Sequence, residues 1–425
     1  MSPYGVLYFF NFCVFIGYYL VLRYQTSMGE SFYNASRLCW TIFIIGLISI
    51  IANNVISFSY NQNYFVFSEA DAGVYHNESI SMSSKSFGDS IDYFLNFWSL
   101  EDLGAVLVIS SLYRLFISNL MLNIFYLILS IFSGLGIFKI SCYLMQKKYA
   151  YFSALSFSLS SFFIWFNSSG LKESVMIFLS IYSFLQYYHF IKTKSLKYIV
   201  YAIPFLLALM LYRPAIPFLI IGSILISSMI GKNRSFVELF VVLALVLGLV
   251  ISYPYLDGIV NKYIGSGGVA RMIEIKELDG MVKGSVQFTY MVNILAGLIG
   301  PLPTLLPNMK PILSFYAPGL IYKSLISIPF WLGIYHIYKR NMFSYYPIAL
   351  FVILESASLI LILEALELRK SLPHFPFIYI VSFGFMSYLD SKNYFNQKIR
   401  NRIYNLFKIS FIVVSFLILF WNFRM

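Results

Sequence analysis

Ionisable residues are scarce in this sequence, and several of them lie in short polar segments between long apolar runs. The first such segment carries Asp71, with Tyr75 four residues later. A carboxylate just beyond an apolar run can act as the general base that takes a proton from a hydroxyl group, and Tyr75, one helical turn away, would orient it. The alternative is a solvated loop in which Asp71 only caps a helix. The same segment contains five rival acids: Glu69, Asp89, Asp92, Glu101 and Asp102.

A second polar segment, from Asn167 to Glu173, joins two short apolar runs. We expect Asn167 and the two serines after it to cap the helix that follows, so that the positive end of the helix dipole faces a ligand. Lys172 beside such a helix N-terminus would suit a phosphate group, with Glu173 next to it. The alternative is an ordinary polar turn with a local ion pair between Lys172 and Glu173.

Three arginines are candidates for binding an anion. Arg213 precedes a proline, which favours an extended backbone at the tip of a helical hairpin. Arg271 lies in the long polar stretch 257–317, and Arg369 lies five residues before His374, where another apolar run begins. A guanidinium group can bind phosphate through two parallel hydrogen bonds. Each of these cations also has a structural interpretation, because basic side chains anchor helix ends at membrane interfaces.

An apolar scaffold must position these residues. Of the 425 residues, 59% are apolar and 11% are charged, whereas soluble domains carry roughly 25% charged residues. A water-soluble fold of this length could not bury so much apolar surface, so the composition excludes a soluble enzyme, a nucleic-acid-binding protein and a disordered chain. It predicts an all-α, polytopic integral membrane protein that forms a single transmembrane domain over 1–425.

The apolar runs predict the membrane spans. Because a bilayer-spanning helix needs about 20 apolar residues, we expect about twelve transmembrane helices, near 3–22, 38–59, 119–145, 149–166, 173–190, 198–212, 214–230, 235–256, 318–338, 344–366, 372–388 and 403–423. Two further apolar segments are interrupted: 103–117 contains Arg114, and 287–306 contains three prolines. We interpret the first as an interfacial helix and the second as a re-entrant or half-helix segment.

Basic residues collect in alternate connections, and the positive-inside rule assigns these to the cytoplasm. These connections hold Arg23 and Arg37; Lys147 and Lys148; Lys192, Lys194 and Lys197; Lys232 and Arg234; Lys339 and Arg340; and the cations of 389–402. The opposite connections include two long loops, 60–118 and 257–317, which we therefore assign to the periplasm. With this topology the candidate residues all fall on the periplasmic side, although they were not used to choose the sides.

The sequence shows no pattern typical of a metal site or of a nucleic-acid partner. The three cysteines lie in or beside apolar runs, and no CxxC motif or His/Cys cluster is present. We expect no metal and no other cofactor, because arginines could carry the charge that a metal would otherwise supply. The net charge of +12 follows from the basic loops and predicts no binding to nucleic acid.

The polar segments together resemble those of polytopic GT-C-type glycosyltransferases. The shared features are an early acid with a nearby tyrosine, the turn Gly170-Leu-Lys172-Glu173, the Arg213-Pro hairpin, and a late Arg369-x-x-x-x-His374-x-Pro run. More narrowly, the aromatic-rich, weakly charged chain resembles the Wzy-type O-antigen and capsule repeat-unit polymerases. The chain departs from the GT-C pattern in placing Asp71 after the second predicted span instead of the first.

This resemblance implies an enzyme of the bacterial inner membrane that acts at the periplasmic face on a sugar donor linked to polyprenyl phosphate or polyprenyl diphosphate. Asp71 matches the family's early acid and would be catalytic. Matching the basic positions that hold the carrier phosphate are Lys172, Arg213 and Arg369. Further substrate-binding candidates are Tyr75, Glu173, Arg271 and His374.

The expected partners are the polyprenyl-linked glycan and membrane lipids, with other polysaccharide-assembly proteins as candidates. Two alternatives stay open. One is a GT-C transferase that adds a single sugar to a lipid or glycan acceptor. The other is a flippase or another transporter of lipid-linked oligosaccharide, although the sequence shows no convincing internal repeat.

Overall fold

The computed structural model describes residues 33–61, 69–97, 100–230, 286–303, 312–362, 364–391 and 397–423. Within these ranges the chain is helical and has no strand. The helices are α2 (Ala35–Asn61), α3 (Glu69–Ser83), α4 (Phe87–Phe97), α5 (Leu100–Tyr113), α6 (Asn119–Leu144), α7 (Lys147–Ser158), α8 (Ser161–Ser168), α9 (Glu173–Thr193), α10 (Lys197–Met210), α11 (Ala215–Ile230), α15 (Val286–Ile299), α16 (Ile312–Arg340), η2 (Phe343–Tyr345), α17 (Tyr346–Leu361), α18 (Leu368–Ser371), η3 (Leu372–His374), α19 (Phe375–Ser391) and α20 (Gln397–Phe423).

Seven of the described helices are long and apolar enough to cross a membrane, or eight if α7 and α8, which meet at a 52° bend, form one span. The predicted spans 3–22 and 235–256 lie outside the described residues. The predicted spans 198–212 and 214–230 correspond to α10 and α11, which have 14 and 16 residues, shorter than the roughly 20 residues that a full span requires. The chain therefore has the helices of a membrane protein, and the count of about twelve stays a prediction.

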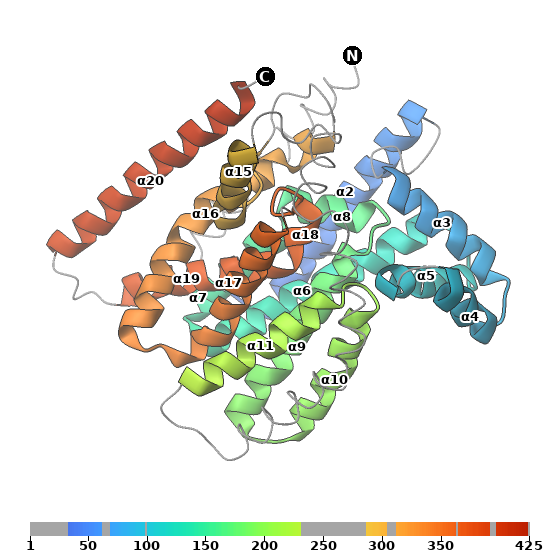
Figure 1. Ribbon diagram of the computed structural model, residues 1–425, viewed down its shortest axis with the longest axis horizontal. Coiled ribbons are helices and arrows are strands. Elements are labelled where there is room, and N and C mark those ends of the chain that lie inside the picture. The colour runs from blue at the N-terminus through green and yellow to red at the C-terminus, as the bar shows by residue number, and fades with distance from the viewer. Residues whose placement is uncertain are drawn as a thin grey trace.

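The long helices pack as one bundle, with α3, α4 and α5 gathered on one side and α20 along the opposite edge (Figure 1). Helix α6 contacts α2, α7 and α9, and α19 contacts α7 and α16. Aromatic rings fill the core: the ring centroids of Phe184 and Phe377 lie 4.7 Å apart, and those of Phe157 and Tyr379 lie 5.7 Å apart. Such edge-to-face pairs contribute stabilisation beyond the area that they bury.

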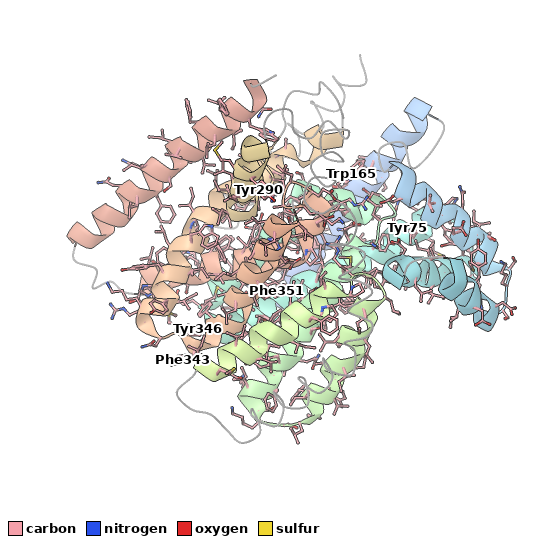
Figure 2. All side chains as sticks on the ribbon, viewed as in Figure 1. Tyr75, Trp165, Tyr290, Phe343, Tyr346 and Phe351 are labelled. Carbon is pink, nitrogen blue, oxygen red and sulfur yellow. The ribbon has the colours of Figure 1, made fainter. Side chains whose placement is uncertain are left out.

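The bundle has two chemically different ends. At one end, the hydroxyl of Tyr345 donates to the carbonyl of Leu144, and the hydroxyl of Tyr188 donates to the carbonyl of Ser344. These bonds bring together the connections after α6, α9 and α16, which carry lysines and arginines, so we call this the basic end. Figure 2 shows Tyr346 near this end and Tyr75 near the opposite one.

The short helix α15 ends inside the protein, and side chains from the middle of α16 donate hydrogen bonds to its last carbonyls. Lys323 Nζ and Ser327 Oγ donate to the carbonyl of Ile299 at 2.8 and 2.9 Å, and Trp331 Nε1 donates to the carbonyl before it at 2.8 Å. Gly300 has a φ of 107°, which lets the chain turn away from the helix axis. Away from water, carbonyls at a helix end need such partners, so α16 determines where α15 stops.

Candidate functional site

Seven side chains from five separate parts of the sequence meet at the end of the bundle opposite the basic end. Helix α3 supplies Asp71 and Tyr75, α5 supplies Asp102, the α8–α9 turn supplies Lys172 and Glu173, the α10–α11 turn supplies Arg213, and α18 supplies Arg369. We call these seven residues the polar cluster. Helices α3, α4 and α5 form a lobe at one side of the bundle (Figure 1). The ion pairs of Asp71 with Arg369 and of Asp102 with Lys172 join this lobe to the bundle near the start of α9.

The α8–α9 turn is built differently from the predicted cap. Lys172 occupies the N-cap position of α9 and makes no side-chain capping bond. Asn167 instead accepts a hydrogen bond from the hydroxyl of Ser174 at 2.8 Å, and Ser169 donates back to α8. The predicted capping role of Asn167 and the serines is therefore wrong. Gly170, with a φ of 73°, allows the sharp turn that delivers Lys172 to the cluster.

Arg369 lies between two carboxylates. Its NH2 group donates to Asp71 Oδ2 at 2.6 Å, and its Nε lies 3.1 Å from Glu173 Oε1, close enough for an ion pair although the N–H is not aligned for a hydrogen bond. The Glu173 side chain is fully buried, whereas those of Asp71 and Arg369 are 44% and 36% exposed. Glu173 is thus a fixed partner of the arginine, and Asp71 is a partner that solvent or a ligand can reach.

A second pair of contacts converges on Asp102. Its Oδ1 atom accepts from the hydroxyl of Tyr75 at 2.6 Å and from Lys172 Nζ at 2.7 Å. Lys172 Nζ also donates to the carbonyl of Tyr212 at 3.3 Å. Burial of Tyr75, with the nearby carboxylate of Asp102, raises the pKa of its phenol above the ordinary value of 10.0. Tyr75 therefore keeps its proton and remains a hydrogen-bond donor.

Arg213 stands at the rim of the cluster. Its NH1 group donates to the carbonyl of Lys370 at 2.9 Å, next to Arg369 in the chain. The turn that carries it is held by Tyr212, which is buried and donates to the carbonyl of Gly104 at 2.9 Å. Among the residues that the structure describes, Arg213 makes no ion pair, so most of its donors stay available to a ligand.

One predicted site residue that the structure describes, His374, does not join the cluster. His374 is buried in η3 with 3% of its surface exposed, and its Nδ1 lies 3.5 Å from Glu355 Oε2 of α17. The predicted position of His374 at the outer mouth is therefore wrong, because the short α18–η3 turn directs the side chain into the bundle. Arg271 lies outside the described residues.

From the sequence alone, Asp102 is one of five acids that rival Asp71 as the general base. Its position in the first turn of a mainly apolar helix is the available signal, because an acid beside an apolar segment is costly unless it has a partner. Lys172 and Tyr75 are those partners. The pairing could not be read from the sequence, since it depends on how α3 and α5 pack against each other and against α9.

No family model, curated protein or solved structure matches this chain.

The formal charges of the polar cluster balance. Three carboxylates, Asp71, Asp102 and Glu173, face three cations, which are Lys172, Arg213 and Arg369. The described residues include no group of three or more His, Cys, Asp or Glu side chains that could hold a metal ion. An anion can enter such a cluster by replacing a carboxylate on a cation. The partly exposed contact between Asp71 and Arg369 is the one most open to exchange, because solvent already competes for it. The arrangement can thus exchange a bound carboxylate for a bound phosphate.

Proposed function

We propose that this protein is a membrane glycosyltransferase that uses a polyprenyl-phosphate- or polyprenyl-diphosphate-linked sugar donor at the periplasmic face of the bacterial inner membrane. Within that class we propose an O-antigen or capsule repeat-unit polymerase. The observation that supports this most is the contact of Asp71 with Arg369, with Arg213 beside it, at the end of the bundle away from the basic loops. It pairs a possible base with cations suited to a phosphate.

The chemistry needs few groups. The acceptor hydroxyl attacks the anomeric carbon of the donor, the bond from that carbon to the phosphate oxygen breaks, and the hydroxyl proton passes to the carboxylate of Asp71. The departing lipid phosphate takes the electron pair of the broken bond and is stabilised by Arg213 and Arg369. Glu173 keeps Arg369 in position, and Asp102 does the same for Lys172.

The position of the cluster suits a lipid-linked substrate. Glu173 begins α9 and Arg369 lies in the first turn of the segment Leu368–Ser391, and both segments are candidate membrane spans. Residues at the ends of spans lie near the level of lipid head groups. A polyprenyl phosphate has its phosphate at that level and its chain in the bilayer, so the same cluster could hold the phosphate of the carrier.

One observation favours the transporter alternative. Lys323, Glu355 and His374 are each at least 97% buried and come from candidate spans. Ionisable residues inside a membrane bundle often mark a transport path. However, Lys323 is bonded to the end of α15, which accounts for one of the three without transport.

Deletion of the gene and electrophoresis of the surface polysaccharide separate these functions. Loss of polymerase activity should collapse the ladder of chain lengths to a single repeat unit. Complete loss of the glycan would instead indicate an assembly transferase or a flippase. A purified protein that releases polyprenyl phosphate or diphosphate from a lipid-linked donor only when an acceptor is present would establish transfer, and a protein that moves the donor across vesicles without releasing it would refute it.

A further inference from the structure

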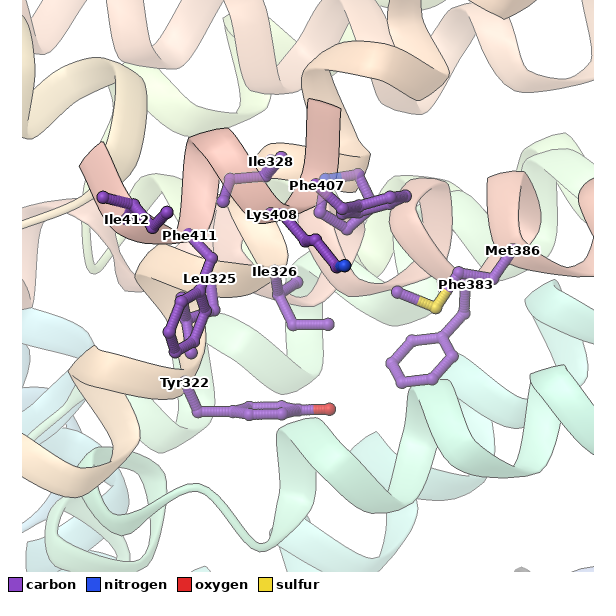
Figure 3. A pocket seen from close by; sticks show the side chains of 11 residues that line it. Tyr322, Leu325, Ile326, Ile328, Phe383, Met386, Phe407, Lys408, Phe411 and Ile412 are labelled. Carbon is purple, nitrogen blue, oxygen red and sulfur yellow. The ribbon is translucent and has the colours of Figure 1, made fainter. Parts of the chain in front are cut away.

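Helix α20 leaves a groove on the outer side of α16 and α19. The groove has a volume of about 540 Å³, and its walls are mainly apolar, including Ile326 of α16, Phe383 of α19 and Phe411 and Ile412 of α20. Figure 3 shows these side chains around the space that they enclose. The described part of α20 packs chiefly against α16, so this groove separates much of the helix from the rest of the bundle.

One cation points into the groove. Among the described residues that line it, Lys408 is the charged one, and Figure 3 shows its ammonium group directed into the space between α16 and α19. A lysine combines an apolar stem with a charged head, so it can line an apolar groove while reaching toward an anion at its mouth. The groove therefore suits an amphipathic ligand with a negative head group.

The lysine of the groove lies toward the basic end. Lys408 is less than one helical turn inside the candidate span Asn405–Asn422, and Asn422 at the other end of that span donates to the carbonyl of Pro303 at 2.9 Å, near the end of α15. The helix rises about 21 Å between Lys408 and Asn422. Lys408 thus lies on the side of the membrane away from the polar cluster.

The sequence adds positive charge at the start of the same helix. The first two turns of α20 contain Lys398, Arg400 and Arg402, in the segment QKIRNR. Clusters of lysine and arginine next to a membrane span attract negatively charged lipids. The positive charge of α20 therefore suits the anionic head group of a lipid, and the apolar groove suits its acyl chain.

We propose that this groove binds a negatively charged phospholipid of the leaflet next to the basic end. An acyl chain lies between α20 and the α16–α19 face, and the phosphate lies within reach of Lys408. The lipid completes the packing of α20 against the bundle. This proposal does not depend on the glycosyltransferase function, because Lys408 and the polar cluster lie toward opposite ends of the spans.

The test compares two lipids that differ only in head group. Full-length protein purified in a neutral detergent is titrated with phosphatidylglycerol or phosphatidylcholine of the same acyl chains, and native mass spectrometry measures the affinity for the first bound lipid. We expect phosphatidylglycerol to bind about fivefold more tightly, the factor that one lysine near a membrane surface provides. Equal affinity for the two lipids would overturn the proposal without any variant being needed.

Variants then locate the site. Lys408→Gln should remove most of the preference, whereas Lys139→Gln, at an exposed lysine inside the span Asn119–Leu144 near the same end, should keep it. Ile412→Trp should weaken the binding of both lipids alike by filling the groove. An unchanged preference in folded, monodisperse Lys408→Gln would overturn the proposal. So would a polyprenyl phosphate that displaces phosphatidylglycerol at lower concentration, since the groove would then belong to the carrier lipid.

Discussion

Replacement of Asp71 by asparagine should abolish turnover and at the same time strengthen binding of the lipid-linked donor. The amide keeps the shape of the carboxylate and removes its basicity, so the proton of the acceptor has no recipient. It also removes a negative charge that contacts Arg369 at 2.6 Å. If the donor phosphate replaces Asp71 on Arg369, the variant no longer has to break an ion pair before it binds.

The size of each effect follows from the geometry. The side chains of Asp71 and Arg369 are 44% and 36% exposed, so water screens the pair, and exposed pairs contribute about 0.2–1 kcal/mol. Releasing that competition should lower the dissociation constant of the donor by about 1.4- to 5-fold. Loss of the general base should lower the rate by about 10²- to 10⁴-fold. The two effects have opposite signs, which a misfolded variant would not reproduce.

The assay measures both quantities on the same purified protein: donor affinity without acceptor, and turnover with acceptor. Asp92→Asn is the matched control, because Asp92 is an exposed acid of α4 in the same lobe and should change neither quantity. Glu173→Gln is the contrasting variant. It removes the buried partner of Arg369 and should weaken donor binding, because the arginine is no longer held in place.

Three results would refute this reasoning. Full turnover in Asp71→Asn would move the base to another acid or remove the need for one. Weaker donor binding in Asp71→Asn would mean that Asp71 supports the phosphate site and does not compete with it. Equal losses of affinity in Asp71→Asn and Glu173→Gln would show that both acids only maintain the structure around Arg369.

Other residues give separate tests. Arg213→Ala should severely reduce glycan assembly at normal protein levels, and Arg213→Lys should restore only part of it, because lysine lacks the planar fork; a normal polysaccharide ladder in Arg213→Ala would leave Arg213 as an anchor. Because burial raises the pKa of Tyr75, the folded protein favours the protonated phenol, and its contribution to stability is present below pH 10.0 and lost as the pH rises above it. The melting temperature of the native protein should therefore fall more steeply above pH 10.0 than that of Tyr75→Phe, and parallel curves would contradict this. In a background without the three native cysteines, an impermeant maleimide added to intact cells should label Ser84→Cys and not Ser391→Cys, and the reverse pattern would invert the topology.

The sequence predicted several elements well because apolar runs of membrane-span length have few alternatives. The predicted runs 119–145, 173–190 and 372–388 coincide with candidate spans in the structure. Asp71 and Arg369 lie 298 residues apart in the chain. The sequence predicts only that both lie on the same side of the membrane. That they form a direct ion pair depends on the packing of α3 against the bundle, which no local pattern encodes.

The errors have local causes. The sequence pattern predicts Asn167 and the serines after it as the cap of α9. In the structure they belong to the end of α8, and α9 starts without a side-chain cap. His374 was expected at the surface because it precedes an apolar run. The α18 helix is only four residues long and continues into η3, and this tight path turns His374 toward Glu355. Turns of this kind are set by packing against other helices, so their side-chain directions cannot be read from hydropathy.

The two carboxylates on Arg369 differ in a way that suggests an order of events. Glu173 is buried at the first residue of α9, where the helix dipole favours a negative charge, so it remains on the arginine when a ligand arrives. Asp71 is half-buried and comes from a different helix, α3, so under the proposed function it is the partner that the donor phosphate would displace. Until then Arg369 donates a hydrogen bond to Oδ2 of this carboxylate, so that this oxygen is occupied. Donor binding and release of the base would therefore be one step, and the acceptor would be activated only when a donor is already in place.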